Sequence, residues 1–305
     1  MTQLSPVRVP RHGSDGKIDF HQHHPHGERH TVEEVLAHQE PNCVVVSVLL
    51  PIETLLAGDG VTPLMPTEAA LAACRAHPDR LVMFCHVDPE RPDALERIRH
   101  YHSLGAKGFG EHKALRPYDL PAVQAVYRLC GELGLPVLIH FWPDQRGGGT
   151  FEEFERMLQT YPDTVFIGHA TGWWLNISGE TSWTRSPNDL ASRPSALPPV
   201  IPGGLTDRWL GQYPNLYGDL SARSGMNALT RDSEFAGGFV NRHRHKLLWG
   251  PDCSCWDGRG TRGVAERPAE CFASTTLRVL KELCDDEETF FDITEGNART
   301  LLRLD

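Results

Sequence analysis

Short apolar runs alternate with amphipathic stretches along most of the chain. The runs are rich in valine, leucine and isoleucine and are bounded by turn-forming residues, which is typical of buried strands. Continuous apolar strands separated by helices indicate a parallel sheet that is covered on both faces. We expect eight strands, at residues 17–21, 43–50, 81–87, 106–111, 136–140, 164–169, 216–221 and 247–252.

Helical stretches fall between most of these strands. Thr31 opens one of them with Glu34 three positions later, which is the capping-box pattern. Gly105 and Gly134 follow two others and are helix-stop signals. The expected helices cover residues 31–39, 67–77, 92–104, 121–133, 151–160, 225–243, 266–284 and 296–303.

Eight strand and helix units fit a closed (β/α)₈ barrel, the TIM barrel, and we expect residues 1–305 to form one such domain. An open doubly wound sheet is the structural alternative. No glycine-rich dinucleotide or phosphate loop follows the first strand, and this disfavours that alternative.

Two stretches interrupt the alternation of strands and helices: residues 176–204 after the sixth strand and residues 253–263 after the eighth. Long loops in compact domains are often active-site covers, so we expect both to lie over the catalytic face. For the first stretch, a disordered surface insertion is the alternative reading. Trp173, Trp174 and Trp183 favour the packed form.

Composition excludes several classes of function. The formal net charge of −10 is spread along the chain, which argues against a nucleic-acid partner. The start of the chain lacks the apolar core of a signal peptide, and the longest apolar run is too short to span a membrane. We therefore expect a cytoplasmic enzyme with a small-molecule substrate and no membrane association. The eight cysteines are expected to be reduced and buried, Cys43, Cys85 and Cys130 among them.

Several expected strands end in a side chain that can bind metal. Active-site groups of a barrel come from the carboxyl ends of its strands, so these side chains should converge. They are His21 and His23, Glu111, His140, His169 and Asp252.

The first pair is weak evidence when it stands alone. Side chains at positions i and i+2 of a strand share a face, so His21 and His23 can present both imidazoles to one ion. The same segment is rich in histidine, and several of its members must be bystanders. These further histidines are His12, His24, His26 and His30.

The other candidates each have a structural alternative. His140 and His169 could be core histidines, but their place at the same end of consecutive strands favours ligands. Asp252 could be a turn cap, or a strand-end carboxylate that binds metal and acts on water. Glu111 could bridge two ions or be an exposed loop acid; we expect it to share a strand face with Lys107 and Phe109. Lys107, as a carbamylated ligand, is a less favoured alternative to Glu111.

Mixed histidine and carboxylate ligands suit a divalent metal, most of all Zn²⁺, with Mn²⁺ and Fe²⁺ as alternatives. Such an ion lowers the pKa of bound water from about 16 to about 7 and polarises a carbonyl group. Asp252 would act as base and then as acid, and His169 would assist it.

At this point the chain resembles the amidohydrolase superfamily, and within it the amidohydrolase 2 branch. Each motif alone is weak evidence for the family, but the order of the motifs along the chain is specific. The matching pieces are Ile18-Asp19-Phe20-His21-Gln22-His23, His77-Pro78-Asp79-Arg80-Leu81, Leu104-Gly105-Ala106-Lys107-Gly108, Leu135-Pro136-Val137-Leu138-Ile139-His140, Phe166-Ile167-Gly168-His169, Asn215-Leu216-Tyr217-Gly218-Asp219-Leu220-Ser221, Leu248-Trp249-Gly250-Pro251-Asp252 and Gly296-Asn297-Ala298.

The resemblance implies a distorted barrel whose metal is held by His21, His23, His140 and Asp252. In one-metal members, the residue matching His169 contacts water or substrate; in two-metal members it is a ligand, together with a carboxylate or modified lysine from strand four. Glu111 is therefore compatible with a second ion. Barrels of this kind are often oligomers, and a homo-oligomer is compatible with the sequence.

There are departures from the family pattern. Gly250-Pro251-Asp252 stands where the branch often has Gly-Ser-Asp, and neither Cys253 nor Cys255 belongs to the pattern. The two cysteines could line the pocket or offer extra metal ligands, although packing is the favoured role.

The branch contains hydrolases of lactones and amides, and also one-metal decarboxylases. We expect a hydrolase of an amide, ester or lactone. The alternative is a non-oxidative decarboxylase of an aromatic or unsaturated acid, in which Arg223 would hold the substrate carboxylate by a bidentate fork. Arg223 and Trp142 are the candidate substrate contacts. A third possibility is a barrel that binds metal and catalyses nothing.

Overall fold

The computed structural model describes residues 16–24, 31–53, 65–113, 115–142, 149–180, 197–253, 255–260 and 271–304. All eight expected strands are present, although most are shorter than expected. They are β1 (Lys17–Gln22), β2 (Val44–Leu49), β3 (Leu81–Met83), β4 (Phe109–His112), β5 (Val137–His140), β6 (Phe166–His169), β7 (Leu216–Asp219) and β8 (Leu247–Leu248).

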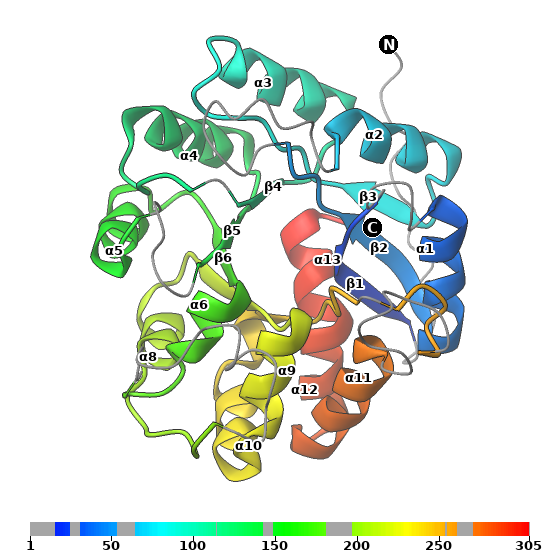
Figure 1. Cartoon of the computed structure of the whole chain (residues 1–305), viewed down its shortest axis with the longest axis vertical. Coiled ribbons are helices and arrows are strands. Elements are labelled where there is room, and N and C mark those ends of the chain that lie inside the picture. Colours follow the sequence, from blue (N-terminus) through cyan, green and yellow to red (C-terminus); the bar gives the residue numbers. More distant parts are fainter. Residues whose placement is uncertain are drawn as a thin grey trace.

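The strands are parallel and follow chain order in two sheets, β1 to β3 and β4 to β8. Backbone hydrogen bonds join the sheets at both edges. At one seam the Cys85 N–H donates to Gly108 O over 2.9 Å, and at the other the Phe20 N–H donates to Trp249 O over 3.0 Å. The eight strands thus form a closed ring surrounded by helices, as Figure 1 shows. The expected TIM barrel is confirmed, and the open doubly wound sheet is excluded.

Five helices occupy the expected positions between the first six strands, on the outside of the ring (Figure 1). Two of them begin with a capping box: the Thr31 and Thr150 side chains each accept from a backbone N–H three residues later. These five helices are α1 (Val32–Gln39), α2 (Thr67–Ala76), α3 (Ala94–Leu104), α4 (Pro121–Leu133) and α5 (Phe151–Thr160).

The second half of the chain departs from the expected helices. The single helix expected at 225–243 is two, α9 (Ala222–Thr230) and α10 (Ser233–Arg242), because the Asp232 side chain caps a new helix by accepting from Phe235 N–H. α6 (Ala170–Leu175) and α8 (Leu205–Gln212) were not expected. The last elements are α11 (Phe272–Leu283), α12 (Glu287–Phe291), η4 (Asp292–Gly296) and α13 (Asn297–Leu302); short 3₁₀ turns are η1 (Glu40–Asn42) and η3 (Arg244–Lys246).

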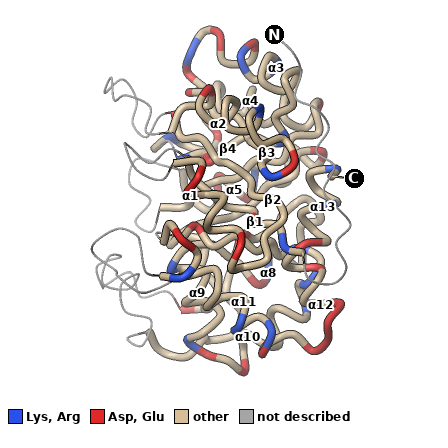
Figure 2. Tube along the Cα trace, turned by 90° about the vertical axis from the view of Figure 1, so that its right-hand side faces the viewer, with Lys and Arg blue, Asp and Glu red and all other residues tan. Residues whose placement is uncertain are grey.

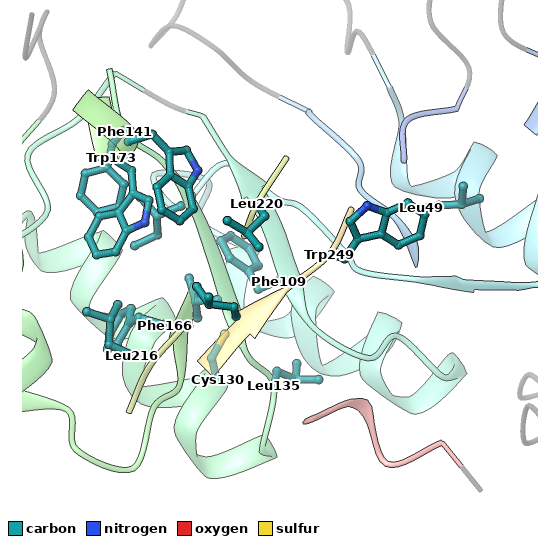
Figure 3. Packing of buried hydrophobic residues seen from close by; sticks show 14 of the residues in the cluster. Leu49, Phe109, Cys130, Leu135, Phe141, Phe166, Trp173, Leu216, Leu220 and Trp249 are labelled. Carbon is teal, nitrogen blue, oxygen red and sulfur yellow. The ribbon is translucent and has the colours of Figure 1, made fainter. Parts of the chain in front are cut away.

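Buried apolar side chains form two clusters. The larger one packs the helices against the outside of the barrel, and Figure 3 shows part of it, with Phe141 and Trp173 adjacent. The smaller one contains alternate strand residues such as Phe20 and Leu138, and with them Ala298 and Leu302 of α13. Helix α13 thereby closes the amino-terminal end of the barrel, so the carboxyl ends of the strands are left for the functional site.

The long stretch after β6 is described only in part. Trp173 and Trp174 are buried in α6, directly before this stretch, whereas Trp183 lies outside the described residues, so the packed form of the stretch stays a prediction. The expectation that the cysteines are buried is wrong for two of them. Cys43 is exposed; it takes a left-handed conformation at the end of η1 and precedes β2. Cys284, which follows α11, is partly buried. All eight cysteines are free thiols.

Charges of both signs are interspersed over the helices in Figure 2. Among the described residues, every helix is too short or too polar to cross a lipid bilayer.

Candidate metal centre

Glu111 lies at the middle of the candidate site and is fully buried. Its Oε2 is 3.3 Å from His23 Nε2 and 4.0 Å from His21 Nε2, whereas its Oε1 is 2.5 Å from His140 Nδ1 and 3.5 Å from His169 Nε2. One carboxylate therefore faces two separate pairs of histidines. The alternative of an exposed loop acid is wrong.

The local backbone explains how Glu111 reaches this position. The β4–β5 register is irregular, since Phe109 pairs with Val137 and His112 with Ile139. Gly110 between them has φ +140, a conformation that glycine adopts without strain. Phe109 packs in the outer cluster, so the expected common face of Phe109 and Glu111 is wrong: the bulge turns Glu111 inward.

The charge of Glu111 is favoured by its neighbours. Burial alone would raise its pKa, but Lys113, with Nζ 3.6 Å from Oε1, and His140 together hold that pKa well below its usual range. Burial and the Lys113 ammonium lower the pKa of His140 to about 3. The buried Glu111 carboxylate is therefore paired with a neutral His140 imidazole, as a cation site needs.

His21 is fixed by a second carboxylate. Its Nδ1 is 2.6 Å from Asp219 Oδ2, and both side chains are fully buried. Burial raises the pKa of Asp219 to about 7 and, together with His169, lowers the pKa of His21. The proton between the two groups is held at Nδ1, so His21 Nε2 keeps its lone pair for the centre of the site.

His23 presents the same nitrogen. Its Nδ1 donates to the backbone oxygen of Leu50 over 2.8 Å, and its Nε2 lies 3.1 Å from His21 Nε2. Burial opposes the charged form of His23, but the contact with Glu111 and the nearby Asp252 raise its pKa. The pair meets although β1 ends at Gln22 and its register with β2 is irregular after Asp19.

His169 and Asp252 complete the group. His169 Nδ1 is 2.5 Å from Ser221 Oγ, and this hydroxyl also donates to Asp219 Oδ2 over 2.9 Å. Asp252 Oδ1 is 3.7 Å from His23 Nε2, and Oδ2 is 3.9 Å from His21 Nε2. The Asp252 side chain is 28% exposed and its backbone φ is +43, an uncommon value for a residue with a side chain. It is thus the most accessible carboxylate of the cluster.

These residues fit a divalent metal. Three overlapping groups of side chains each bring their ligand atoms within 4.8 Å of one another. Among the described residues, Glu111 Oε2 is buried without a hydrogen-bond partner. The Nε2 lone pairs of His21 and His23 also point at one space, which a cation would stabilise. The three groups are His21, His169 and Asp252; His21, His23 and Glu111; and Glu111, His140 and His169.

The candidate substrate contacts are more loosely placed. Trp142 lies beside His140, with ring centroids 4.5 Å apart, and its Nε1–H donates to Lys113 O over 3.2 Å. Arg223, at the start of α9, lies over the Phe272 ring at 5.4 Å and belongs to none of the three ligand groups.

Lys107 is not part of the site. It precedes β4 and lies near His102 at the end of α3: burial, then the charge of Arg303 and then that of Lys107 lower the pKa of His102. The carbamylated-lysine alternative has no support in this geometry.

Sequence reasoning missed three residues of the site. Asp219 and Ser221 stand in one of the family-like motifs, and Lys113 follows Glu111 by two positions. Asp219 and Ser221 are two polar residues at the end of an apolar strand, and this pattern could have indicated that they belong to the site. Their role is to orient histidines, which spacing alone does not reveal.

Comparisons with known proteins agree with this fold. The amidohydrolase family model matches residues 55–198. No curated protein matches the chain. Among solved structures, a probable 2-pyrone-4,6-dicarboxylic acid hydrolase from Acinetobacter baumannii, with citric acid bound, has a TM-score of 0.62 at 15% identity, over 94% of this chain and 99% of that one.

Two decarboxylases share the fold as well. 2,6-Dihydroxybenzoate decarboxylase from Rhizobium has a TM-score of 0.54 at 15% identity, over 95% of this chain and 99% of that one. 5-Carboxyvanillate decarboxylase from Novosphingobium aromaticivorans, complexed with manganese and 4-hydroxy-3-methoxy-5-nitrobenzoic acid, has a TM-score of 0.52 at 15% identity, over 88% and 79% of the two chains.

Proposed function

We propose that the chain belongs to the amidohydrolase 2 branch of the TIM-barrel proteins and is a metal-dependent hydrolase of a small-molecule amide, ester or lactone. The match of the family model to residues 55–198 and the shared barrel fold support this. The position of Glu111 carries this proposal. Its two oxygens face different histidine pairs, an arrangement that suits a carboxylate shared by two ions. A water-attack reaction uses such a pair of ions, whereas a one-metal decarboxylase does not need the second.

Six side chains would hold the metal. Zn²⁺ suits this mixture of imidazole and carboxylate, with Mn²⁺ and Fe²⁺ as alternatives. When bound, a divalent ion polarises the substrate carbonyl and makes water more acidic. The proposed ligands are His21, His23, Glu111, His140, His169 and Asp252.

Asp252 is the proposed proton carrier. Its side chain is the most exposed of the cluster, so it can reach both water and substrate. It would take a proton from the attacking water and return it to the leaving group. The Ser221 hydroxyl holds His169 Nδ1, so His169 Nε2 would be a ligand in the two-ion form. With a single ion, the same nitrogen would contact the water or substrate instead.

The substrate would lie at the carboxyl ends of the strands, beside Trp142. The indole N–H donates to Lys113 O, and the indole ring lies against the His140 ring at a tilt of 49°, which gives an apolar wall next to the ligands. Arg223 is proposed as the contact for an anionic group of the substrate.

A decarboxylase of an aromatic or unsaturated acid is the second candidate. Arg223 follows β7 at the same end of the barrel as the metal ligands, where it could hold a carboxylate. The likeness to two decarboxylases adds to this candidate at the level of fold.

A paired assay separates the candidates. The metal-loaded protein is offered a panel of lactones, esters and amides, and separately a panel of aromatic acids with CO₂ release as the readout. Hydrolysis that depends on added metal supports the proposal. CO₂ release without hydrolysis overturns it in favour of the decarboxylase, and no turnover on either panel contradicts both.

A further inference from the structure

A second group of metal-competent side chains lies outside the candidate active site. His38 comes from α1, Cys253 and Cys255 follow β8, and Cys271 directly precedes α11. One ligand atom of each lies within 4.8 Å of all the others. All four residues are buried, with exposures of 0% for His38 and at most 6% for the cysteines. Residues more than two hundred positions apart thus converge on one point.

The composition of this group matches one kind of metal site. Three thiols and one imidazole form the Cys₃His set that holds structural Zn²⁺ with no open position. In such a site a sulfur and a nitrogen lie about 3.6 Å apart, since each is about 2.0–2.3 Å from the ion. His38 Nε2 and Cys271 Sγ are 3.8 Å apart. The thiols are free, so no disulfide explains their convergence.

Backbone N–H groups donate to two of the sulfurs. The Phe272 N–H donates to Cys253 Sγ and the Gly260 N–H donates to Cys255 Sγ, each over 3.1 Å. Backbone donors to sulfur support thiolate ligands. The Cys255 thiol donates a hydrogen bond to Asp257 Oδ1 over 3.1 Å, and metal binding would release this thiol proton.

The imidazole is also placed as a ligand would be. Its Nε2 is the nitrogen that faces the sulfurs, 3.8 Å from Cys271 Sγ, so this nitrogen would be the ligand. The Asn42 amide donates to His38 O over 3.0 Å and to Gly258 O over 3.4 Å, which ties α1 to the loop after β8. Gly258 has φ +66, and an added Cβ would lie 2.6 Å from His38 O.

We propose that His38, Cys253, Cys255 and Cys271 form a structural Zn²⁺ site, separate from the active site. The site would join α1 to the segments on either side of residues 261–270. Helix α1 belongs to the first strand and helix unit of the ring, and the two cysteine segments belong to the last. The ion would therefore stabilise the contact between the first and last units, where the barrel closes. It would also anchor the chain at Cys253, directly after Asp252.

Cobalt substitution tests this site in the intact protein. The protein is loaded with Co²⁺ in place of its metal, and its absorption spectrum is recorded. Three thiolate ligands produce an intense sulfur-to-cobalt charge-transfer band in the near ultraviolet, which histidine and carboxylate ligands do not. The band is expected in the wild type and in Glu111→Gln. Its absence from the wild type overturns the proposal.

Variants locate the ligands. Cys271→Ser is expected to lose the band and about one Zn²⁺ per chain by elemental analysis. Cys284→Ser, which changes a cysteine outside the group, should keep both. Retention of the band in Cys271→Ser would contradict the assignment. If Cys271→Ser does not fold, thiol titration of the denatured wild type still decides, because fewer than eight reduced cysteines would show a disulfide in place of the metal.

Discussion

Asp219 Oδ2 accepts a hydrogen bond from His21 Nδ1 over 2.6 Å, in a part of the barrel where neither side chain reaches solvent. This contact fixes the imidazole ring and leaves Nε2 toward Glu111. The same carboxylate oxygen accepts from Ser221 Oγ, which in turn contacts His169. One buried aspartate therefore orients two candidate ligands.

The first prediction follows from that contact. Asp219→Asn should weaken metal binding about 10- to 100-fold, because loss of the carboxylate removes the partner that orients His21. Competition with a chromophoric chelator measures the affinity. Asp79→Asn, an exposed aspartate in the turn before β3, is the matched control. Equal affinities for Asp219→Asn and the control would refute the orienting role.

Asp252→Asn should separate metal binding from catalysis. Asparagine keeps an oxygen ligand but takes up no proton at neutral pH, so turnover should fall by about 100- to 10,000-fold. Metal content should be partly retained, and Asp79→Asn should behave as the wild type. Full activity in Asp252→Asn would show that another group carries the proton.

Gly250 is required by the seam of the barrel. An added Cβ would lie 2.4 Å from the His21 backbone nitrogen, so Gly250→Ala must push β1 away from the strand beside it. We expect a loss of about 1–3 kcal/mol in the free energy of unfolding, and weaker metal binding.

Chemical denaturation measures that loss, with Gly211→Ala as the control. The nearest atom to an added Cβ at Gly211 is 3.8 Å away, and the residue lies within α8. This control should be neutral or slightly stabilising. If Gly250→Ala were as stable as the wild type, the contact between residue 250 and β1 could not be as close as the structure shows.

A buried pair of histidines makes stability depend on pH. His86 Nδ1 accepts from Glu53 N–H over 2.9 Å, and His86 Nε2 lies 3.3 Å from His112 Nδ1. Burial lowers the pKa of His86, and burial together with Arg116 lowers the pKa of His112 to about 4. Both rings are neutral in the folded protein. A further proton on either ring would place an N–H group directly opposite another N–H group, where an acceptor is needed.

The unfolded chain binds a proton on His112 below the ordinary histidine pKa of about 6.5, whereas the folded chain does so only below about 4. The lowered pKa of His86 acts in the same direction. Stability should therefore be full above pH 6.5 and fall as the pH drops toward 4, by about 3 kcal/mol for His112. Denaturation across this range should show a shallower fall for His112→Asn, which does not titrate. The same slope in both proteins would rule out the contribution of His112.

The order of the elements was predictable because apolar runs and glycine or proline boundaries are local signals. Strand β4 shows the limit: its apolar pattern was clear, but the bulge at Gly110 that turns Glu111 inward depends on the pairing with β5. The division of the predicted helix at Asp232 was missed because its capping signal is a single residue within a helical pattern.

The candidate site was predictable to the extent that strand ends meet in a barrel. The five strand-end positions do converge, but the buried partners Asp219 and Lys113 depend on three-dimensional contacts. The group of His38 with three cysteines could not be predicted by spacing, because α1 and the segment after β8 meet only when the ring closes.

Metal content tests the central claim most directly, namely that Glu111 is shared by two ions. Wild type and Glu111→Gln are purified side by side with Glu132→Gln, an exposed control, and each is measured by elemental analysis. Any ion that is bound elsewhere in the chain is present in all three proteins, so it drops out of the difference in metal content between Glu111→Gln and the wild type. We predict that Glu111→Gln holds at least one ion fewer per chain than both of the others. An unchanged metal content in Glu111→Gln would contradict the shared carboxylate and, with it, the reason for preferring hydrolysis.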